Sequence, residues 1–138
     1  MGESTDSTSQ TNGTNKDKTV HRELSYRVTQ AVFEVHSVLG PGFGESVYEE
    51  ALAHELGLRG IPFERQRAVT IAYKGQTVGS QRLDMVIEGK IVLELKAASE
   101  LNDLFKQQTL SYLRATGLEL GILINFGAAR VEYVRITN

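Results

Sequence analysis

The sequence predicts one α/β (α+β) domain in which helices flank a mixed central sheet, in the element order ααβββαββ. Two observations support this prediction. Segments with helical spacing occupy the start and the later part of the chain, and segments rich in β-branched residues lie between and after them. At 138 residues the chain can bury a single core without disulfides. It contains no cysteine, so thiolate metal sites and cysteine nucleophiles are excluded.

The N-terminal segment, residues 1–22, has few large apolar side chains and many Ser, Thr, Asn and Gly residues. Such a segment cannot offset its ordering entropy by burial. We therefore expect a disordered polar tail before a domain formed by residues 23–138. The chain shows neither the apolar stretch of a signal peptide nor the run of about 18 apolar residues of a membrane helix. These features predict a cytoplasmic protein without a membrane partner.

Three segments have the periodicity of amphipathic helices. Residues 23–39 place apolar side chains at three- and four-residue spacing and charged side chains on the other face. The glycine-rich segment 40–44 interrupts this pattern, and a second helix is expected over residues 45–59. A third helix is expected over residues 102–115, with Gly117 in the position of a left-handed cap.

Five segments have the composition of strands. Residues 68–73, 76–87 and 91–97 follow one another through short turns, which predicts a three-strand antiparallel meander. Residues 120–126 and 130–136 are expected to pair as a hairpin. The run 120–126 is apolar without alternation, as in a strand that helices cover on both faces.

The third strand carries the first candidate site. Alternation along residues 91–97 places Glu94 and Lys96 on one face. A three-residue turn at residues 88–90 would pair Asp84 directly with Glu94, whereas a two-residue turn would put them on opposite faces. The register therefore decides whether two carboxylates lie side by side.

Two adjacent carboxylates repel each other unless a positive charge lies between them. The three histidines lie in separate segments without paired ligand spacing, so oxygen ligands and hence Mg²⁺ or Mn²⁺ are favoured over zinc. Lys96 would then contact water or phosphate. The alternative is a solvated strand face, on which Arg82 partners a carboxylate for little energy.

A glycine-rich loop precedes the second helix, and helical spacing places Glu45, Tyr48 and Glu49 along one side of it. Glu45 could thus face the same site. The alternative is helix capping, since Ser46 and Glu49 fit a capping box. A phosphate cradle is set aside, because no strand precedes the glycines and the Gly-Lys-Ser/Thr ending of a P-loop is missing.

The net charge of −2 supplies no general attraction for nucleic acid, so such a ligand would need a local basic patch. Clustering of basic residues around the carboxylates would favour a nuclease, and scattering would favour a binding module. The candidate residues are Arg59, Arg65, Arg67, Lys74, Arg82, Lys106 and Arg114.

Several short motifs also stand in a characteristic order. They are Gly42-x-x-Glu45-x-x-Tyr48, Arg82-x-Asp84, Glu94-Leu95-Lys96, Gln108 followed by Tyr112-Leu113, and Leu123-Ile124-Asn125-Phe126. Together they resemble the GxxExxY proteins, which are grouped with the PD-(D/E)XK nuclease superfamily. The resemblance implies a restriction-endonuclease-like core of a helix, a three-strand meander, a helix and a strand. Leu83 replaces the nominal proline of the motif, and Phe105 stands where similar proteins often have histidine.

The resemblance also implies a function, namely Mg²⁺- or Mn²⁺-dependent hydrolysis of phosphodiester bonds in DNA or RNA. The alternative is a catalytically inactive module of the same fold that binds nucleic acid or protein. Whether the protein is a homodimer is left open. The implied metal ligands are Asp84, Glu94 and the main-chain carbonyl of Leu95, and the implied catalytic residues are Lys96, Glu45 and Gln108.

Overall fold

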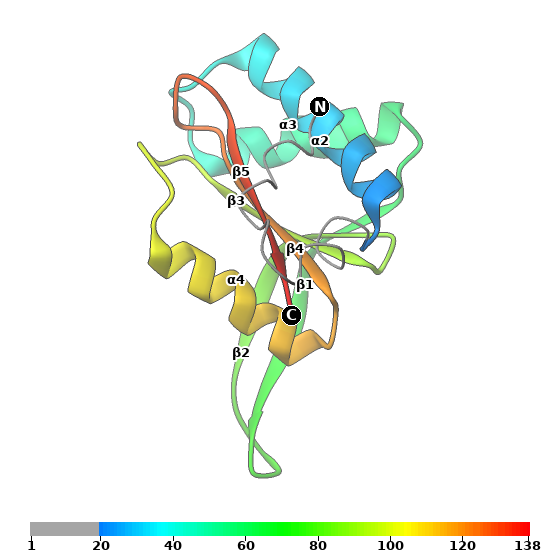
Figure 1. Ribbon diagram of the computed structural model, residues 1–138, viewed down its shortest axis with the longest axis vertical. Coiled ribbons are helices and arrows are strands. Elements are labelled where there is room, and N and C mark those ends of the chain that lie inside the picture. Colours follow the sequence, from blue (N-terminus) through cyan, green and yellow to red (C-terminus); the bar gives the residue numbers. More distant parts are fainter. Residues whose placement is uncertain (1–19) are drawn as a thin grey trace.

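The computed structural model describes residues 20–138, and the greater part of the expected tail lies outside the described residues. Within this range the element order is the predicted one (Figure 1). The predicted tail is one residue too long, because Arg22 is the first residue of a helix. The elements are α2 (Arg22–Leu39), α3 (Glu45–Leu58), β1 (Phe63–Tyr73), β2 (Gln76–Ile87), β3 (Ile91–Lys96), α4 (Asp103–Thr116), β4 (Leu120–Asn125) and β5 (Glu132–Thr137).

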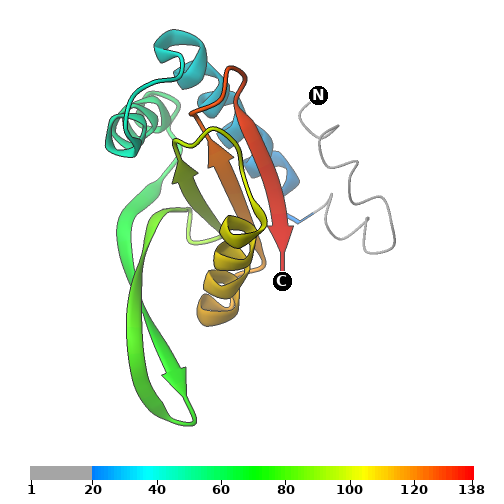
Figure 2. The ribbon, with the colours of Figure 1, turned by 90° about the vertical axis from the view of Figure 1, so that its left-hand side faces the viewer.

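The five strands form one mixed sheet in the order β1-β2-β3-β4-β5. The β3–β4 pair is parallel, because α4 connects these strands, and the other three pairs are antiparallel. Helices cover both faces of the sheet, with α2 and α4 on opposite sides of β4 and β5 (Figure 2). The predicted fold class is thus confirmed.

The hydrophobic core has two parts. The larger part lies between the sheet and the helices α2 and α3, and the smaller part lies beneath α4. Strand β4 is buried along its whole length, as its apolar run predicted. Among the described helices, none combines the length and apolar character needed to cross a membrane.

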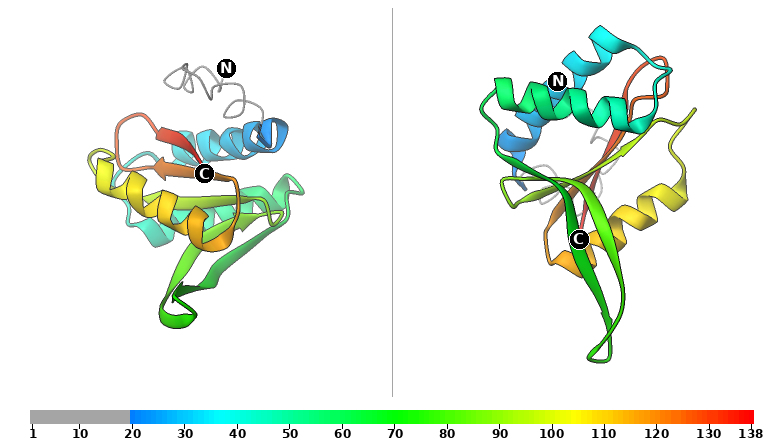
Figure 3. Two further views of the ribbon diagram at one scale, coloured as in Figure 1. Left: turned by 60° about the horizontal axis from the view of Figure 1, so that its bottom comes forward. Right: turned by 180° about the vertical axis from the view of Figure 1, so that it is seen from behind.

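The first strand is longer than predicted. It begins at Phe63 rather than at residue 68. The sequence pattern misses this start because residues 64–67 are polar and exposed and show no apolar alternation. Strands β1 and β2 continue together beyond the body of the sheet as a two-stranded ribbon (Figures 2 and 3). We call residues 67–82 of this ribbon the arm.

Candidate functional site

The β2–β3 register is the one that a three-residue turn predicts, with Met85 opposite Leu93 and Ile87 opposite Ile91. Continued by one residue, it places Asp84 opposite Glu94. At this point the main-chain N–H groups donate to side-chain carboxylates instead of to main-chain carbonyls. The Asp84 N–H donates to Glu94 Oε2 at 3.2 Å, and the Leu95 N–H donates to Asp84 Oδ2 at 2.8 Å. One oxygen of each carboxylate is therefore fixed by the main chain.

The β1–β2 ribbon changes face at Asp84. Met85 packs into the core beneath α2 and α3, whereas Leu83 packs into the core beneath α4. Residues two apart on a regular strand share a face, so the strand turns over between them. Gln66, which would pair with Asp84, is left out of the pairing and has a φ of 53°. This irregularity interrupts the β1–β2 pairing beside the carboxylate pair.

Burial governs the charge of this pair. Glu94 is only 6% exposed, and burial together with the charge of Asp84 raises its pKa to about 8. Burial also raises the pKa of Asp84, and the charges of Glu49 and Glu45 act in the same direction. The main-chain N–H of Leu95 opposes this rise. Without a metal, Glu94 thus retains its proton at neutral pH. A bound cation would stabilise both carboxylates in their charged form.

Lys96 lies next to the pair. Its positive charge lowers the pKa of both Asp84 and Glu94. Its Nζ lies 4.6 Å from the ring centroid of Phe105 on α4, which indicates a cation–π contact. The aromatic residue at this position therefore holds the lysine beside the carboxylates.

Asn125, at the end of β4, anchors the segment that follows Lys96. Its Oδ1 accepts the Ala98 N–H at 2.9 Å, and its Nδ2 donates to the Ala98 carbonyl at 2.9 Å and to Glu132 Oε1 at 3.0 Å. The sequence motifs include Asn125 but predict no role for it. The signal available was a polar residue that ends an otherwise apolar strand.

The glycine-loop motif divides into two roles. Glu45 and Glu49 raise the pKa of Asp84 through their charge, which places the start of α3 beside the carboxylate pair. Tyr48 turns instead into the core, where its ring stacks on Phe126 at a centroid distance of 4.6 Å. Tyr48 is therefore a core residue, whereas Glu45 and Glu49 lie beside the carboxylates.

The capping-box alternative is wrong. Gly44 is the N-cap of α3, and no side chain caps it. Glu49 accepts hydrogen bonds from Arg65 Nε and Gln66 Nε2, each at 3.0 Å. It therefore ties α3 to the irregular part of β1.

On α4, the residue brought near the pair is Tyr112. Burial and then the charges of Glu94 and Asp84 raise its pKa. Gln108 is exposed one turn earlier, and in the described part of the chain no hydrogen bond joins it to the carboxylates. Tyr112 belonged to the quoted motifs, but sequence reasoning gave it no place in the site.

Most of the basic candidates are paired with acidic side chains. Four of the seven make ion pairs with nearby acids, which leaves less positive charge for a ligand. Lys74, Arg82 and Arg114 have no ion pair within residues 20–138. The paired residues are Arg59, Arg65, Arg67 and Lys106.

The donor set fits magnesium or manganese only in part. In the described residues no group of three or more His, Asp or Glu side chains is arranged to hold a metal ion. Asp84 and Glu94 offer one carboxylate each. The main-chain carbonyl of Leu95 directly follows Glu94 in the chain. Magnesium is commonly held by one or two carboxylates together with waters and substrate phosphates. The buried Glu94 and the half-buried Asp84 meet that description.

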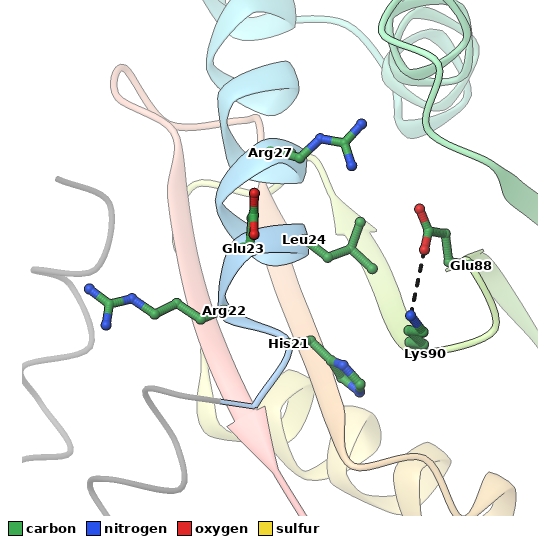
Figure 4. A pocket seen from close by; sticks show the side chains of 7 residues that line it. All are labelled: His21, Arg22, Glu23, Leu24, Arg27, Glu88 and Lys90. Carbon is green, nitrogen blue, oxygen red and sulfur yellow. Dashed lines mark ion pairs between the residues drawn. The ribbon is translucent and has the colours of Figure 1, made fainter.

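A separate open cavity of about 490 Å³ lies between the first turns of α2 and the β2–β3 turn (Figure 4). Arg22 and Arg27 line it from α2, and the ion-paired Glu88 and Lys90 line it from the turn. None of the predicted site residues lines this cavity. It therefore plays no part in the carboxylate site.

Comparison with known proteins identifies the fold. A family model described as the PD-(D/E)XK nuclease superfamily matches residues 22–136. The crystal structure of SSO0001 is similar with a TM-score of 0.56 and 23% sequence identity, over 86% of this chain. The match covers 63% of that chain, which is less than two thirds of its length. A search of curated proteins gave no match.

Proposed function

Because the chain belongs to the PD-(D/E)XK nuclease superfamily, we propose that it is a divalent-metal-dependent nuclease that hydrolyses phosphodiester bonds in nucleic acid. The observation that carries this proposal is the pair formed by the half-buried Asp84 and the buried Glu94, with Lys96 beside it. A solvated strand face would not bury Glu94 to 6% exposure or raise its pKa. The order of the short motifs further supports membership of the GxxExxY group.

The metal ligands in this proposal are Asp84, Glu94 and the main-chain carbonyl of Leu95. The main-chain N–H bonds orient both carboxylates and leave the second oxygen of each available. Glu94 must release its proton on binding, so affinity for the metal should rise with pH. When bound, Mg²⁺ or Mn²⁺ would polarise the phosphodiester and lower the pKa of a water molecule.

The neighbouring side chains have complementary roles. Lys96 places a positive charge where negative charge develops on the phosphate oxygens, and Phe105 restricts its position. Glu45 adds a carboxylate at the start of α3, which suits a second contact with metal-bound water. Gln108 is proposed as a polar contact for the substrate from α4.

The alternative function is a binding module that keeps the fold without turnover. One observation favours it, namely that most of the basic candidates are already paired with acids. This module would bind nucleic acid or protein but would show no Lys96-dependent cleavage. Residues 23–138 would form the domain in either case, and the nucleic-acid substrate favours a cytoplasmic location.

The decisive experiment incubates labelled single- and double-stranded DNA and RNA with Mn²⁺ or Mg²⁺. We expect Lys96→Ala and Asp84→Ala to reduce cleavage by about 10²-fold or more, as losses of transition-state stabilisation do. Lys90→Ala, at the exposed β2–β3 turn, removes the same charge away from the site and should retain activity. Equal products from all four proteins would indicate contamination and contradict the enzyme.

Calorimetric titration with Mn²⁺ separates the two functions. Metal binding that depends on Asp84, combined with nucleic-acid binding but no cleavage, would identify the binding module. Binding by neither the wild type nor its variants would contradict the metal site itself.

A further inference from the structure

The arm has a charge unlike the rest of the chain. Between Arg67 and Arg82 the sequence contains three basic residues and no acidic residue, although the whole chain has 17 acidic and 15 basic residues. The three are Arg67, Lys74 and Arg82. Of these three residues, Arg67 alone makes an ion pair within the described part of the chain, at 3.5 Å to the exposed Glu64. The arm is therefore a positive strip on an acidic protein.

The arm is a two-stranded ribbon whose proximal part packs beneath α4 through Val69 and Ile71. Its distal part extends past the sheet and past α4 (Figures 2 and 3). Thr77 pairs with Ala72 and Gln76 with Tyr73, so the ladder continues to the turn at Lys74 and Gly75. The seven residues from Gln76 to Arg82 span about 20 Å. Such a ribbon can reach well away from the protein body.

The base of the arm lies at the carboxylate site. Arg82 is two residues from Asp84, and its Nη1 donates to the Gln66 carbonyl at 3.0 Å. Gln66 is the residue left unpaired opposite Asp84. At the other end, Lys74 Nζ lies 5.4 Å from the Tyr73 ring centroid, and Tyr73 is 61% exposed. Basic groups thus mark both the base and the tip.

We propose that the arm lies in the major groove of a DNA duplex and directs that duplex to the carboxylate site. This inference rests on the proposed nuclease function and names its substrate class. The major groove is about 12 Å wide and admits a two-stranded β-ribbon. Arginine and lysine on the ribbon neutralise the flanking phosphates. A-form RNA has a deep, narrow major groove, so duplex RNA should fit less well.

A second copy of the chain is the competing occupant, because Tyr73 and Val78 on the arm are exposed apolar side chains. Charge argues for DNA. Two arms related by symmetry would bring their basic residues together, and like charges repel. A polyanion instead gains an attractive contact from each basic residue of the strip.

The test measures binding by fluorescence anisotropy in EDTA, so that no cleavage takes place. The probes are a labelled DNA duplex, its single strand and an RNA duplex of the same sequence. The arm variant is Lys74→Gln with Arg82→Gln, and the control is Arg27→Gln with Lys90→Gln at the distant cavity. Both variants lose two positive charges, so their net charges match.

We expect the arm variant to bind duplex DNA at least tenfold more weakly than the control. The slope of log affinity against log salt should fall by about 2, one for each lost phosphate contact. Lys74→Gln alone, at the exposed turn, should lower the slope by about 1 and guards against misfolding of the double variant. Circular dichroism verifies the fold of each protein.

Three outcomes would overturn the inference. These are equal affinities of the arm and control variants, tighter binding of the single strand or the RNA duplex than of DNA, and loss of a dimer in sedimentation caused by the arm variant. Cleavage with Mn²⁺ is measured separately. Lys96-dependent cleavage without an arm effect would leave the nuclease standing, and arm-dependent binding without cleavage would leave the arm standing.

Discussion

Replacing Glu94 by glutamine should stabilise the metal-free protein, and by an amount that depends on pH. Folding raises the pKa of this carboxyl group from 4.5 to about 8. Each pKa unit corresponds to about 1.4 kcal/mol, so the whole difference amounts to about 5 kcal/mol. Below pH 4.5 the contribution of Glu94 to stability is fully present. As the pH rises towards 8 the unfolded chain releases its proton while the folded protein retains it, so the free energy of unfolding falls.

Urea unfolding in EDTA at several values between pH 4 and pH 9 measures this effect. We expect the difference in unfolding free energy, Glu94→Gln minus wild type, to increase with pH by about 5 kcal/mol and to level off above about pH 8. Glu23→Gln, at an exposed position of α2, controls for the substitution itself. A difference that stays constant with pH would refute the reasoning, because it would mean that Glu94 titrates alike in the folded and unfolded chains.

The remaining predictions concern packing around the site. Gly127→Ala should cost more than about 3 kcal/mol in urea unfolding, since the added Cβ would lie 2.3 Å from the Ala98 carbonyl oxygen. Gly79→Ala, with open space around its Cβ, should cost less than about 1 kcal/mol, and equal costs would contradict the close approach. Tyr48→Phe should cost about 1–2 kcal/mol, because the Gly40 carbonyl loses its hydroxyl donor at 2.5 Å. An unchanged midpoint would show that water replaces this bond.

The order of elements could be predicted from sequence because it depends on local patterns, and the register of the site could be narrowed to two alternatives that differ in the length of one turn. Helical spacing fixed α2 and α3 within one residue. The turn at residues 88–90 set which residues of β2 and β3 oppose one another, and the observed pairs agree. The apolar run of β4 indicated burial on both faces of the sheet.

The start of β1 and the exchange of faces at Asp84 could not be predicted. Residues 64–67 are polar, and they are in a strand only because β2 offers them a pairing partner. The left-handed conformation of Gln66 comes from the same tertiary setting, since nothing in its residue type favours a positive φ. Ion pairing also depends on the fold, which is why Arg65 proved to be bound to Glu49 and Glu50 of α3.

The two main-chain N–H groups at the site donate to carboxylates rather than to carbonyls. An amide proton is sensitive to the charge of its acceptor, and the acceptors here are the groups that bind a proton or a metal. The amide resonances of Asp84 and Leu95 therefore report the state of the site without any added label. In a ¹⁵N-correlated spectrum they would shift together on titration with acid or Mg²⁺, while amides in the regular ladder, such as Val92, stay in place.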